Sequence, residues 1–547
     1  MSTDNNQTCV SFIQYMWFLY LFTILCFSRA KNVLMIVVDD LRPALGSYLD
    51  EDAYTPNIDS FSSDSLIFQH AYAQQALCAP SRNSFLTSRR PDTLHLYDFY
   101  NYWRSSVFNF TTLPQYFKEN NYRTASIGKY FIQCHGGLII WSENDDQPYS
   151  WTDSPYHAPT EKYKNAKVCH SQSGKKLGKN LVCPVRVSKQ PGGTLPDLEL
   201  LNEAKTFLHS HDKSKRFFLA VGFHKPHIPL KYPHEYLQMV TKKLSQYYSL
   251  RQKPIDLPSV AWNPWTDVRD RDDIKALNVS FPYDKWVRLI RQSYFAAVSY
   301  IDDLIGHLLS SLSASGLEKD TIVLLTSDHG WSLGEHGEWS KYSNFERAVR
   351  VPFILKIPGQ TDESDPNTNS FSYVDELVEL VDVFPTLVDL VGLKPLPLCP
   401  ADSSTVELCS EGISLVPLIN QYTSHQKTKI PWKTGVFSQY PRPGLYPSMK
   451  PNSDKPHNNQ IKIMGYSLRT DVFRYTEWLQ FNPITFKANW SAVEAVELYH
   501  HGIDPEENMN LSVRPGFEKI CAELRKQGKF VGKYLIFLFI KKKKKLK

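Results

Sequence analysis

Glycine is scarce in this sequence, net charge is confined to one end, and internal repeats are absent. Only 24 of the 547 residues are glycine, against 35 prolines, which excludes a collagen-like chain. The formal charge of +6 matches the six lysines of the closing KKKKKLK. The rest of the chain is therefore neutral and lacks the basic field that nucleic-acid binding requires. Hydrophobic residues make up 42% and charged residues 22%, which excludes wholesale disorder.

The first 30 residues combine an uncharged apolar run with a cleavage pattern of small residues. The run extends from Val10 to Ser28, long enough for a membrane span or for the core of a signal peptide. Ser28 and Ala30 stand at positions −3 and −1 of a cut after Ala30, which favours a cleaved signal peptide over 1–30. No Lys or Arg precedes the run, so a signal-anchor remains the alternative. In either case the rest of the chain lies outside the cytosol.

The C-terminal residues 531–547 do not resemble part of a folded domain. Their apolar stretch, Lys533 to Ile540, is too short to span a membrane. The lysine run that follows is either a polybasic membrane contact or the product of translation past the true end of the protein. We favour the second and predict a non-native or disordered tail, with no stable membrane span once the signal is cleaved.

The cysteines and the glycosylation sequons fit the secretory route. Cys169 and Cys183 lie 14 residues apart, and Cys399 and Cys409 lie 10 apart. Both pairs flank loop-like stretches, which predicts two local disulfides. Cys78 has no obvious partner. The sequons that could carry glycans in a secreted chain are at Asn109, Asn278, Asn489 and Asn510.

Three apolar runs rich in β-branched or aromatic residues predict buried parallel strands. They cover Asn32 to Val38, Arg216 to Val221 and Thr321 to Thr326. Each run delivers polar residues at its C-terminal end. Because ligands bind at that edge of open α/β sheets, we expect the functional site there.

Helical patterns fall between these strands. Trp286 to Leu312 has apolar residues at helical spacing, and Glu376 to Leu390 does so with an interruption at Pro385. Alternation of strands and helices indicates one large α/β domain, which we place at 31–434. Between 435 and 530 the sequence alternates like antiparallel strands, which predicts a smaller C-terminal domain.

Polar groups of three kinds follow the predicted strands. Asp39 and Asp40 are adjacent carboxylates, which are costly to bury unless a cation joins them. Their hard oxygen atoms suit Ca²⁺ or Mg²⁺. The commoner alternative is that the two residues lie in an exposed turn. Asp328 and His329 could complete a metal site or cap the next segment. His227, in a Pro-bracketed loop, could be an acid, a base or an anion ligand, although a lone histidine is more often structural.

The fourth group is Cys78 in the sequence CAPSR, shortly before LTSRR. In an oxidising compartment, an unpaired cysteine in such a loop is not expected to act as a plain thiol nucleophile. A buried free cysteine would explain neither the flanking residues nor the coincidence with groups of metal-ligand type.

Cys-x-Pro-x-Arg followed by Leu-Thr-x-Arg resembles the signature of the type I sulfatases. The blocks RRPDT, LYDF, AVGFHKPHIP, TSDHGWSLGEHGEW, KYSNF and SQYPRP also resemble this family. The resemblance implies an α/β fold of the alkaline-phosphatase type, in which helices flank a large mixed sheet and a smaller α+β domain follows. It also implies that Cys78 is oxidised to formylglycine by the formylglycine-generating enzyme.

The resemblance further implies a role for each candidate residue. One Ca²⁺ ion would be held by Asp39, Asp40, the modified Cys78, Asp328 and His329. Arg82 would hold the formylglycine, and Lys129, His227 and Lys341 would surround the sulfate.

The implied reaction is hydrolysis of a sulfate ester. One hydroxyl of the hydrated aldehyde, its pKa lowered by Ca²⁺, attacks sulfur, and the two lysines stabilise the charge on the sulfate oxygens. His227 is the candidate acid for the leaving sugar oxygen. The second hydroxyl then expels sulfate and restores the aldehyde.

The blocks most resemble family members that remove the 2-O-sulfate from terminal iduronate of heparan sulfate and dermatan sulfate. We therefore expect a sulfated glycosaminoglycan as substrate. The same resemblance implies delivery to the lysosome through the secretory pathway, with secretion as the alternative.

Two positions depart from the family pattern. Ile132 stands where the family has a histidine, and His135, in the same stretch as Cys134, is out of register. Ser88 replaces a glycine. These departures leave two alternatives open, a catalytically impaired glycan-binding relative and a sulfatase for a different sulfated sugar. A phosphohydrolase with two Zn²⁺ ions is disfavoured, because it would use Ser or Thr in place of Cys78.

Overall fold

The computed structural model describes residues 31–129, 145–170, 176–240, 252–277, 284–362, 371–424 and 429–531. The predicted signal peptide, the segment with Ile132, Cys134 and His135, the Asn278 sequon and the C-terminal tail from 532 onward lie outside these residues. Across the described ranges, no helix is long and apolar enough to cross a membrane.

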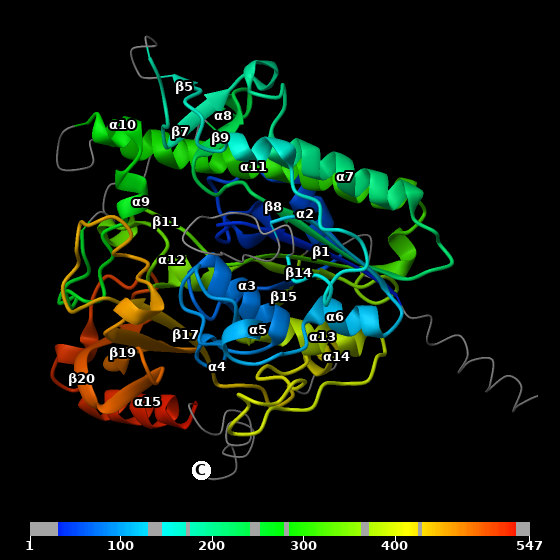
Figure 1. Ribbon diagram of the computed structural model, residues 1–547. Helices are drawn as coiled ribbons and strands as arrows, with labels where there is room; N and C mark the ends of the chain where they lie inside the picture. Colours follow the sequence, from blue (N-terminus) through cyan, green and yellow to red (C-terminus); the bar gives the residue numbers. More distant parts are fainter. Residues whose placement is uncertain are drawn as a thin grey trace, which may run out of the picture.

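The central sheet is mixed and has seven strands (Figure 1). β1 runs parallel to both β10 and β8, β4 is parallel to β8, and β14 is antiparallel to β10 and β2. The three predicted strands therefore lie side by side at the centre. In spatial order the strands are β15 (Ser372–Val374), β2 (Leu66–Phe68), β14 (Phe353–Lys356), β10 (Thr321–Ser327), β1 (Asn32–Val38), β8 (Phe217–Phe223) and β4 (Arg123–Gly128).

Both faces of this sheet are covered by helices, which explains why β1 is apolar along its whole length. Leu34 and Ile36 belong to the core on one face, and Val33 and Met35 to the core on the other. In Figure 1 the first face carries α2 (Pro56–Ser63), α7 (Pro196–Ser210) and α11 (Asp284–Ala314). The second carries α3 (Cys78–Thr87), α6 (Leu113–Glu119), α13 (Val383–Leu390) and α14 (Val416–Thr423).

The helix predicted from Glu376 to Leu390 is wrong in its first half. The chain there forms β16 (Val378–Glu379) and the short 3-10 helix η6 (Leu380–Asp382) before α13 begins at Val383. Pro385 does not interrupt α13, because it lies in the first turn, where the backbone N–H groups have no partner within the helix.

A second, four-stranded antiparallel sheet follows in the C-terminal part. It contains β17 (Gly435–Arg442), β18 (Ile463–Thr470), β19 (Phe473–Asn482) and β20 (Lys487–His500). α15 (Glu518–Val531) contacts β18 and β19. Hydrogen bonds join this sheet to the residues that follow β3 (Ala71–Tyr72), from Ser438 Oγ to the Ala73 carbonyl (2.7 Å) and from the Gln439 amide to the Gln74 carbonyl (2.8 Å).

Both predicted cysteine pairs are disulfides in the structure. The Cα atoms of Cys169 and Cys183 are 5.0 Å apart, and those of Cys399 and Cys409 are 4.9 Å apart. Such separations are typical of disulfides.

The described sequons differ in accessibility. Asn109 and Asn489 are exposed, whereas Asn510 is only 1% exposed. The Asn510 amide nitrogen donates to the carbonyl oxygens of Asp256 and Val496, each at 3.1 Å. A glycan on that nitrogen does not fit the folded chain, so the prediction for Asn510 is corrected.

Candidate active site

The site lies at the sheet edge where β1, β10 and β8 end. Asp39 and Asp40 directly follow β1, Asp328 follows β10, and His227 lies in the loop after β8. Asp40 has a φ of 64°, and its carbonyl oxygen accepts a hydrogen bond from the Tyr294 hydroxyl at 2.7 Å. This left-handed residue turns the chain sharply at the strand end, a kind of strain that clusters at functional sites.

Cys78 is the first residue of α3, and its buried sulfur lies among these groups. Sγ is 3.5 Å from Asp39 Oδ1 and 3.3 Å from His329 Nε2. Two ammonium groups also contact it, Lys341 Nζ at 3.0 Å and Lys129 Nζ at 3.6 Å. Residues far apart in the sequence therefore converge on one sulfur atom.

The donor atoms around Cys78 fit a divalent cation. Ligand atoms of Asp39, Asp40, Cys78 and His329 all lie within 4.8 Å of one another, and all four residues are buried. Asp40 Oδ2 is buried without a hydrogen-bond partner among the described residues, which is costly unless a cation satisfies it. Carboxylate oxygens with an imidazole are ligands that divalent cations accept.

Asp328 lies beside this group. Its Oδ1 accepts the Asp40 amide at 3.2 Å, and its Oδ2 is 3.6 Å from His329 Nε2. Arg82 Nε donates to the same Oδ2 at 2.9 Å, and another Arg82 nitrogen donates to the Lys129 carbonyl. Arg82 thus ties α3 to the ends of β10 and β4.

The two lysines form ion pairs with the two adjacent aspartates. Lys129 Nζ contacts Asp39 Oδ2, and Lys341 Nζ lies 2.6 Å from Asp40 Oδ1. Burial opposes the charge of each lysine, but the carboxylates outweigh it and raise the pKa of both. Both lysines are therefore cationic beside the sulfur.

Burial sets the protonation of three other groups. It raises the pKa of the Cys78 thiol to about 12, so the unmodified thiol is neutral and a poor nucleophile. It lowers the pKa of His329 to about 4, which leaves the imidazole in the neutral form that binds metals. Burial also raises the pKa of Asp40 to about 7, although the charge of Lys341 lowers it. A bound cation would ionise this carboxyl group.

His227 lies at the rim of the site. Its Nε2 is 3.9 Å from Asp40 Oδ2, and 16% of its side chain is exposed, whereas that of Asp40 is fully buried. Its Nδ1 is 2.6 Å from the Ile228 carbonyl oxygen, which fixes the ring. Burial and the charges of Lys164 and Lys129 lower the pKa of His227. This histidine is a titratable group between the buried centre and solvent.

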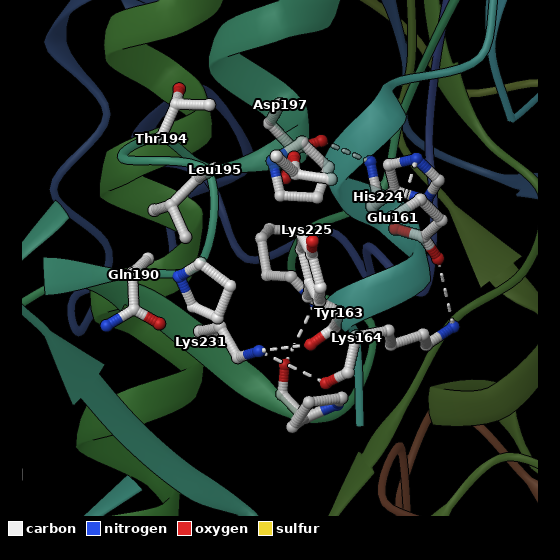
Figure 2. Close-up of a pocket in the computed structure, with 14 residues that line it drawn as sticks. Glu161, Tyr163, Lys164, Gln190, Thr194, Leu195, Asp197, His224, Lys225 and Lys231 are labelled. Atoms are coloured by element: carbon white, nitrogen blue, oxygen red, sulfur yellow. Dashed lines mark hydrogen bonds and ion pairs between the residues drawn. The ribbon is translucent and has the colours of Figure 1, made fainter. Parts of the chain in front are cut away.

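A separate cavity adjoins the loop that carries His227. It is lined by parts of that loop and by residues of the segments 160–164 and 190–197. Figure 2 shows the ammonium of Lys231 directed at the backbone oxygens of Tyr163 and Lys164. Among the described residues that line the cavity, none was predicted for the site.

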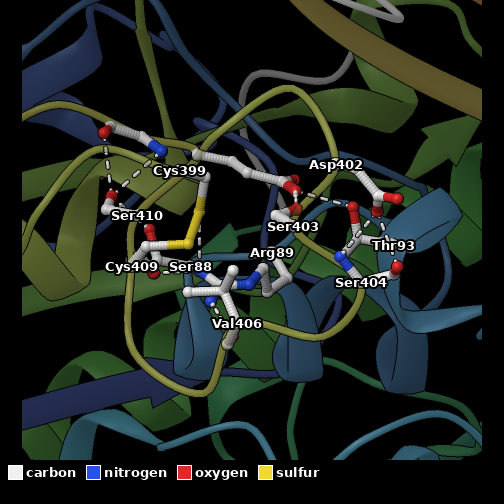
Figure 3. Close-up of a disulfide and its surroundings, with 12 residues drawn as sticks. Ser88, Arg89, Thr93, Cys399, Asp402, Ser403, Ser404, Val406, Cys409 and Ser410 are labelled. Atoms are coloured by element: carbon white, nitrogen blue, oxygen red, sulfur yellow. Dashed lines mark hydrogen bonds between the residues drawn. A yellow bond between two sulfur atoms is a disulfide. The ribbon is translucent and has the colours of Figure 1, made fainter.

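The disulfide Cys399–Cys409 holds the segment that follows α3 (Figure 3). Ser88, which replaces a family glycine, has a φ of 52°, and its hydroxyl donates to the Val381 carbonyl at 2.6 Å. The neighbouring Arg89 is fully buried and donates to the Cys409 carbonyl. Serine thus adopts the conformation that glycine favours, held by hydrogen bonding.

The residues that fix the position of Lys341 were not identified from the sequence. Its neighbours Ser340 and Tyr342 have φ values of 76° and 77°, and Asp267 Oδ2 accepts a hydrogen bond from each hydroxyl, at 3.2 Å and 2.7 Å. Asn263 Nδ2 donates to the Lys341 carbonyl at 2.6 Å. More than 70 positions separate Asp267 and Asn263 from these partners, and no motif links them.

Comparison with known proteins identifies the class of protein. A match to the sulfatase family covers residues 31–393, well over half of the chain. The chain belongs to the sulfatase family, and it is a sulfuric ester hydrolase of that class. The predictions of family and fold are confirmed.

Two relatives carry a more particular name. The chain is 48% identical over 507 residues to iduronate 2-sulfatase of Mus musculus, which covers 88% of this chain and 91% of the relative. It is also 48% identical over 510 residues to iduronate 2-sulfatase of Homo sapiens, with the same coverage.

Solved structures share the fold at lower identity. A structure in complex with its substrate D-glucosamine-2-N,6-O-disulfate has a TM-score of 0.63 and 19% identity, covering 92% of this chain and 98% of the other. A phosphonate monoester hydrolase from Silicibacter pomeroyi has a TM-score of 0.64 and 19% identity, covering 91% and 94%. At such identities these likenesses show the fold alone.

Proposed function

We propose that this sulfatase removes the 2-O-sulfate from terminal iduronate residues of heparan sulfate and dermatan sulfate. The observation that carries the proposal is 48% identity to two iduronate 2-sulfatases over 91% of their length. The site described above agrees with it, because buried cations and metal-type ligands surround one cysteine. We further propose that the enzyme acts in the lysosome, which it reaches through the secretory pathway.

The cofactors of this proposal are one Ca²⁺ ion and a formylglycine made from Cys78. The ion would be held by Asp39, Asp40, Asp328, His329 and the modified residue 78. When bound, the ion and the hydrated aldehyde together supply the nucleophile and charge stabilisation. The maturation partner would be the formylglycine-generating enzyme.

The remaining residues of the site bind the sulfate and orient the reacting groups. Lys129 and Lys341 each place an ammonium beside position 78, where they bind the sulfate oxygens and stabilise charge that develops there. Arg82 fixes position 78 by tying α3 to the ends of two strands. His227, at the rim, transfers a proton to the sugar oxygen as the ester bond breaks.

The test compares sulfate release from a 2-sulfated iduronate substrate with phosphate release from an aryl phosphate. Protein made in secretory cells should release sulfate and no phosphate. If neither is released although mass analysis shows an aldehyde at position 78, the chain is a silent glycan-binding relative. Release from other sulfated sugars but not from iduronate would instead indicate a different specificity.

Position 78 can be tested directly with Cys78→Ser. We expect this variant to fold but to stop after at most one turnover, because serine lacks the second hydroxyl that releases sulfate. Urea unfolding checks the fold, and the sulfate released per enzyme checks turnover. Sustained turnover by the serine variant would refute the formylglycine mechanism.

Ile132 offers a second test, because the family has a histidine at this position. We expect Ile132→His to raise kcat if a donor is missing from the site. An unchanged or lower kcat would show that another group, such as His135, already serves.

A further inference from the structure

The cavity beside the His227 loop is lined by more ammonium groups than carboxylates. Lys225 and Lys231 are each 8% exposed, and both line the cavity together with Lys164. The carboxylates that line it are Glu161 and Asp197. Three ammonium groups therefore face two carboxylates.

The two carboxylates are already engaged by other groups. Glu161 lies 3.7 Å from Lys164 Nζ and 3.7 Å from His224 Nε2. Asp197 Oδ1 accepts the His224 amide at 2.6 Å. Within the described ranges, Lys225 and Lys231 form no ion pair with any carboxylate.

Backbone oxygens are the partners of these two lysines. Lys231 Nζ donates to the carbonyls of Tyr163 and Lys164, each at 3.1 Å. Lys225 Nζ donates to the carbonyl of Pro229 at 2.9 Å and to that of His227. An ammonium group has three N–H donors. Each of these lysines uses two of them on carbonyl oxygens, so one N–H has no acceptor among the described residues.

We propose that this cavity is an accessory oxyanion site, which takes a sulfate or carboxylate group between Lys225 and Lys231. A buried cation without a counter-charge is costly, and an oxyanion would supply both the charge and the acceptors. Burial outweighs the nearby carboxylates, Asp197 for Lys225 and Glu161 for Lys231, and lowers the pKa of both lysines to about 8. The cavity has a volume of about 30 Å³ and is partly open to solvent, which gives an anion access.

The site is distinct from the sulfate position proposed beside Cys78. The cavity lining includes neither Cys78 nor the two lysines that contact its sulfur. The loop 224–229 nevertheless contributes to both places, since Lys225 holds its carbonyls while His227 faces Asp40. An anion bound in the cavity would therefore lie directly behind the proposed acid.

Selenate tests the proposal, because selenium scatters anomalously and reports its position in crystals of the full chain. In the wild type we expect an anomalous peak within hydrogen-bond reach of Lys225 and Lys231. Lys231→Gln should lower the selenate affinity at this peak at least fivefold, while Lys231→Arg should retain it. Lys189→Gln is the matched control, since Lys189 is an exposed lysine next to the cavity.

Two outcomes would overturn the proposal. One is no peak in the wild type at saturating selenate, and the other is an equal affinity in Lys231→Gln. Both outcomes are binding results that do not depend on turnover. They can therefore be distinguished from a failure of the proposed sulfatase specificity. An unchanged kcat for an aryl sulfate verifies that Lys231→Gln is folded.

The source of the anion is settled by kinetics of the same variant. If the site binds a sulfate carried by the glycan, KM rises for a sulfated tetrasaccharide and stays constant for a small aryl sulfate. If the site binds free sulfate, both KM values stay constant and sulfate binding alone weakens. Equal losses of kcat for both substrates would show a structural role for Lys231 and refute the assignment.

Discussion

Removal of the Asp267 carboxylate should impair turnover more than folding. Asp267, in the short helix α9 (Thr266–Arg269), accepts hydrogen bonds from the hydroxyls of Ser340 and Tyr342. Lys341, between them, places its Nζ 2.6 Å from Asp40 Oδ1 and 3.0 Å from the Cys78 sulfur. The carboxylate therefore acts as a positioning group for Lys341.

The size of the effect follows from two opposing contributions. A left-handed conformation costs roughly 1–2 kcal/mol for each residue other than glycine, and two such residues flank Lys341. A hydrogen bond to a charged group stabilises by about 1.5–3 kcal/mol. The two hydrogen bonds that Asp267 accepts thus offset the strain, and their loss lets Lys341 move. Loss of even one such bond in the transition state corresponds to about a 10- to 150-fold lower kcat.

Steady-state kinetics with an aryl sulfate measures this effect. Asp267→Ala should lower kcat strongly with a smaller change in KM, and Asp267→Asn, whose amide oxygen still accepts, should lose less. Ser340→Gly in the Asp267→Ala background should restore part of kcat, because glycine adopts a φ of 76° without strain. Asp270→Ala is the control, since Asp270 is exposed and pairs only with Lys275 among its described neighbours. Wild-type kcat in Asp267→Ala, or no recovery with glycine, would refute the positioning role.

The free energy of unfolding should depend on pH through the carboxyl group of Glu379, and the Tm should depend on bound metal through the carboxyl group of Asp40. Burial opposes the charge of Glu379, but Arg90 and a neighbouring lysine outweigh it and hold the pKa at about 2. A carboxyl whose pKa is depressed in the folded state stabilises the fold at pH values above its unfolded pKa of about 4.3. The free energy of unfolding should therefore fall as the pH drops from about 5 to about 2, and urea titrations of Glu379→Gln should lose that part of the dependence. Added Ca²⁺ should raise the Tm of the wild type by calorimetry and that of Asp40→Asn much less; an equal rise in both would contradict the metal assignment.

The central strands were predictable because their environment is simple. A strand buried on both faces must be apolar at every position, so NVLMIVV identifies β1 without any knowledge of its neighbours. The long periodicity from Trp286 to Leu312 likewise predicted α11, which extends two residues further at each end, from Asp284 to Ala314. The structure around Pro385 could not be predicted in the same way. The local sequence does not show whether a proline lies in the first turn of a helix or in its interior.

The candidate site was predictable only where its residues follow strands or lie in a recognisable motif. Asp39, Asp40, Asp328 and His329 come directly after β1 and β10, so the topology brings them to one edge. Lys129 and Lys341 came from resemblance alone. Local sequence does not show that a lysine will approach a particular sulfur atom.

For a physical reason, the sequence alone could not show which residues hold Lys341 in place. Ser340 and Tyr342 have no intrinsic preference for left-handed backbone, so nothing local indicates that they adopt it. Asp267, 73 and 75 positions away, accepts a hydrogen bond from each of their hydroxyls, which supports this conformation. A chain can keep such strain only where the surrounding structure fixes it. The chemistry of a sulfatase site is therefore specified locally by its motif, while the position of Lys341 is specified by a long-range contact that only the folded chain contains.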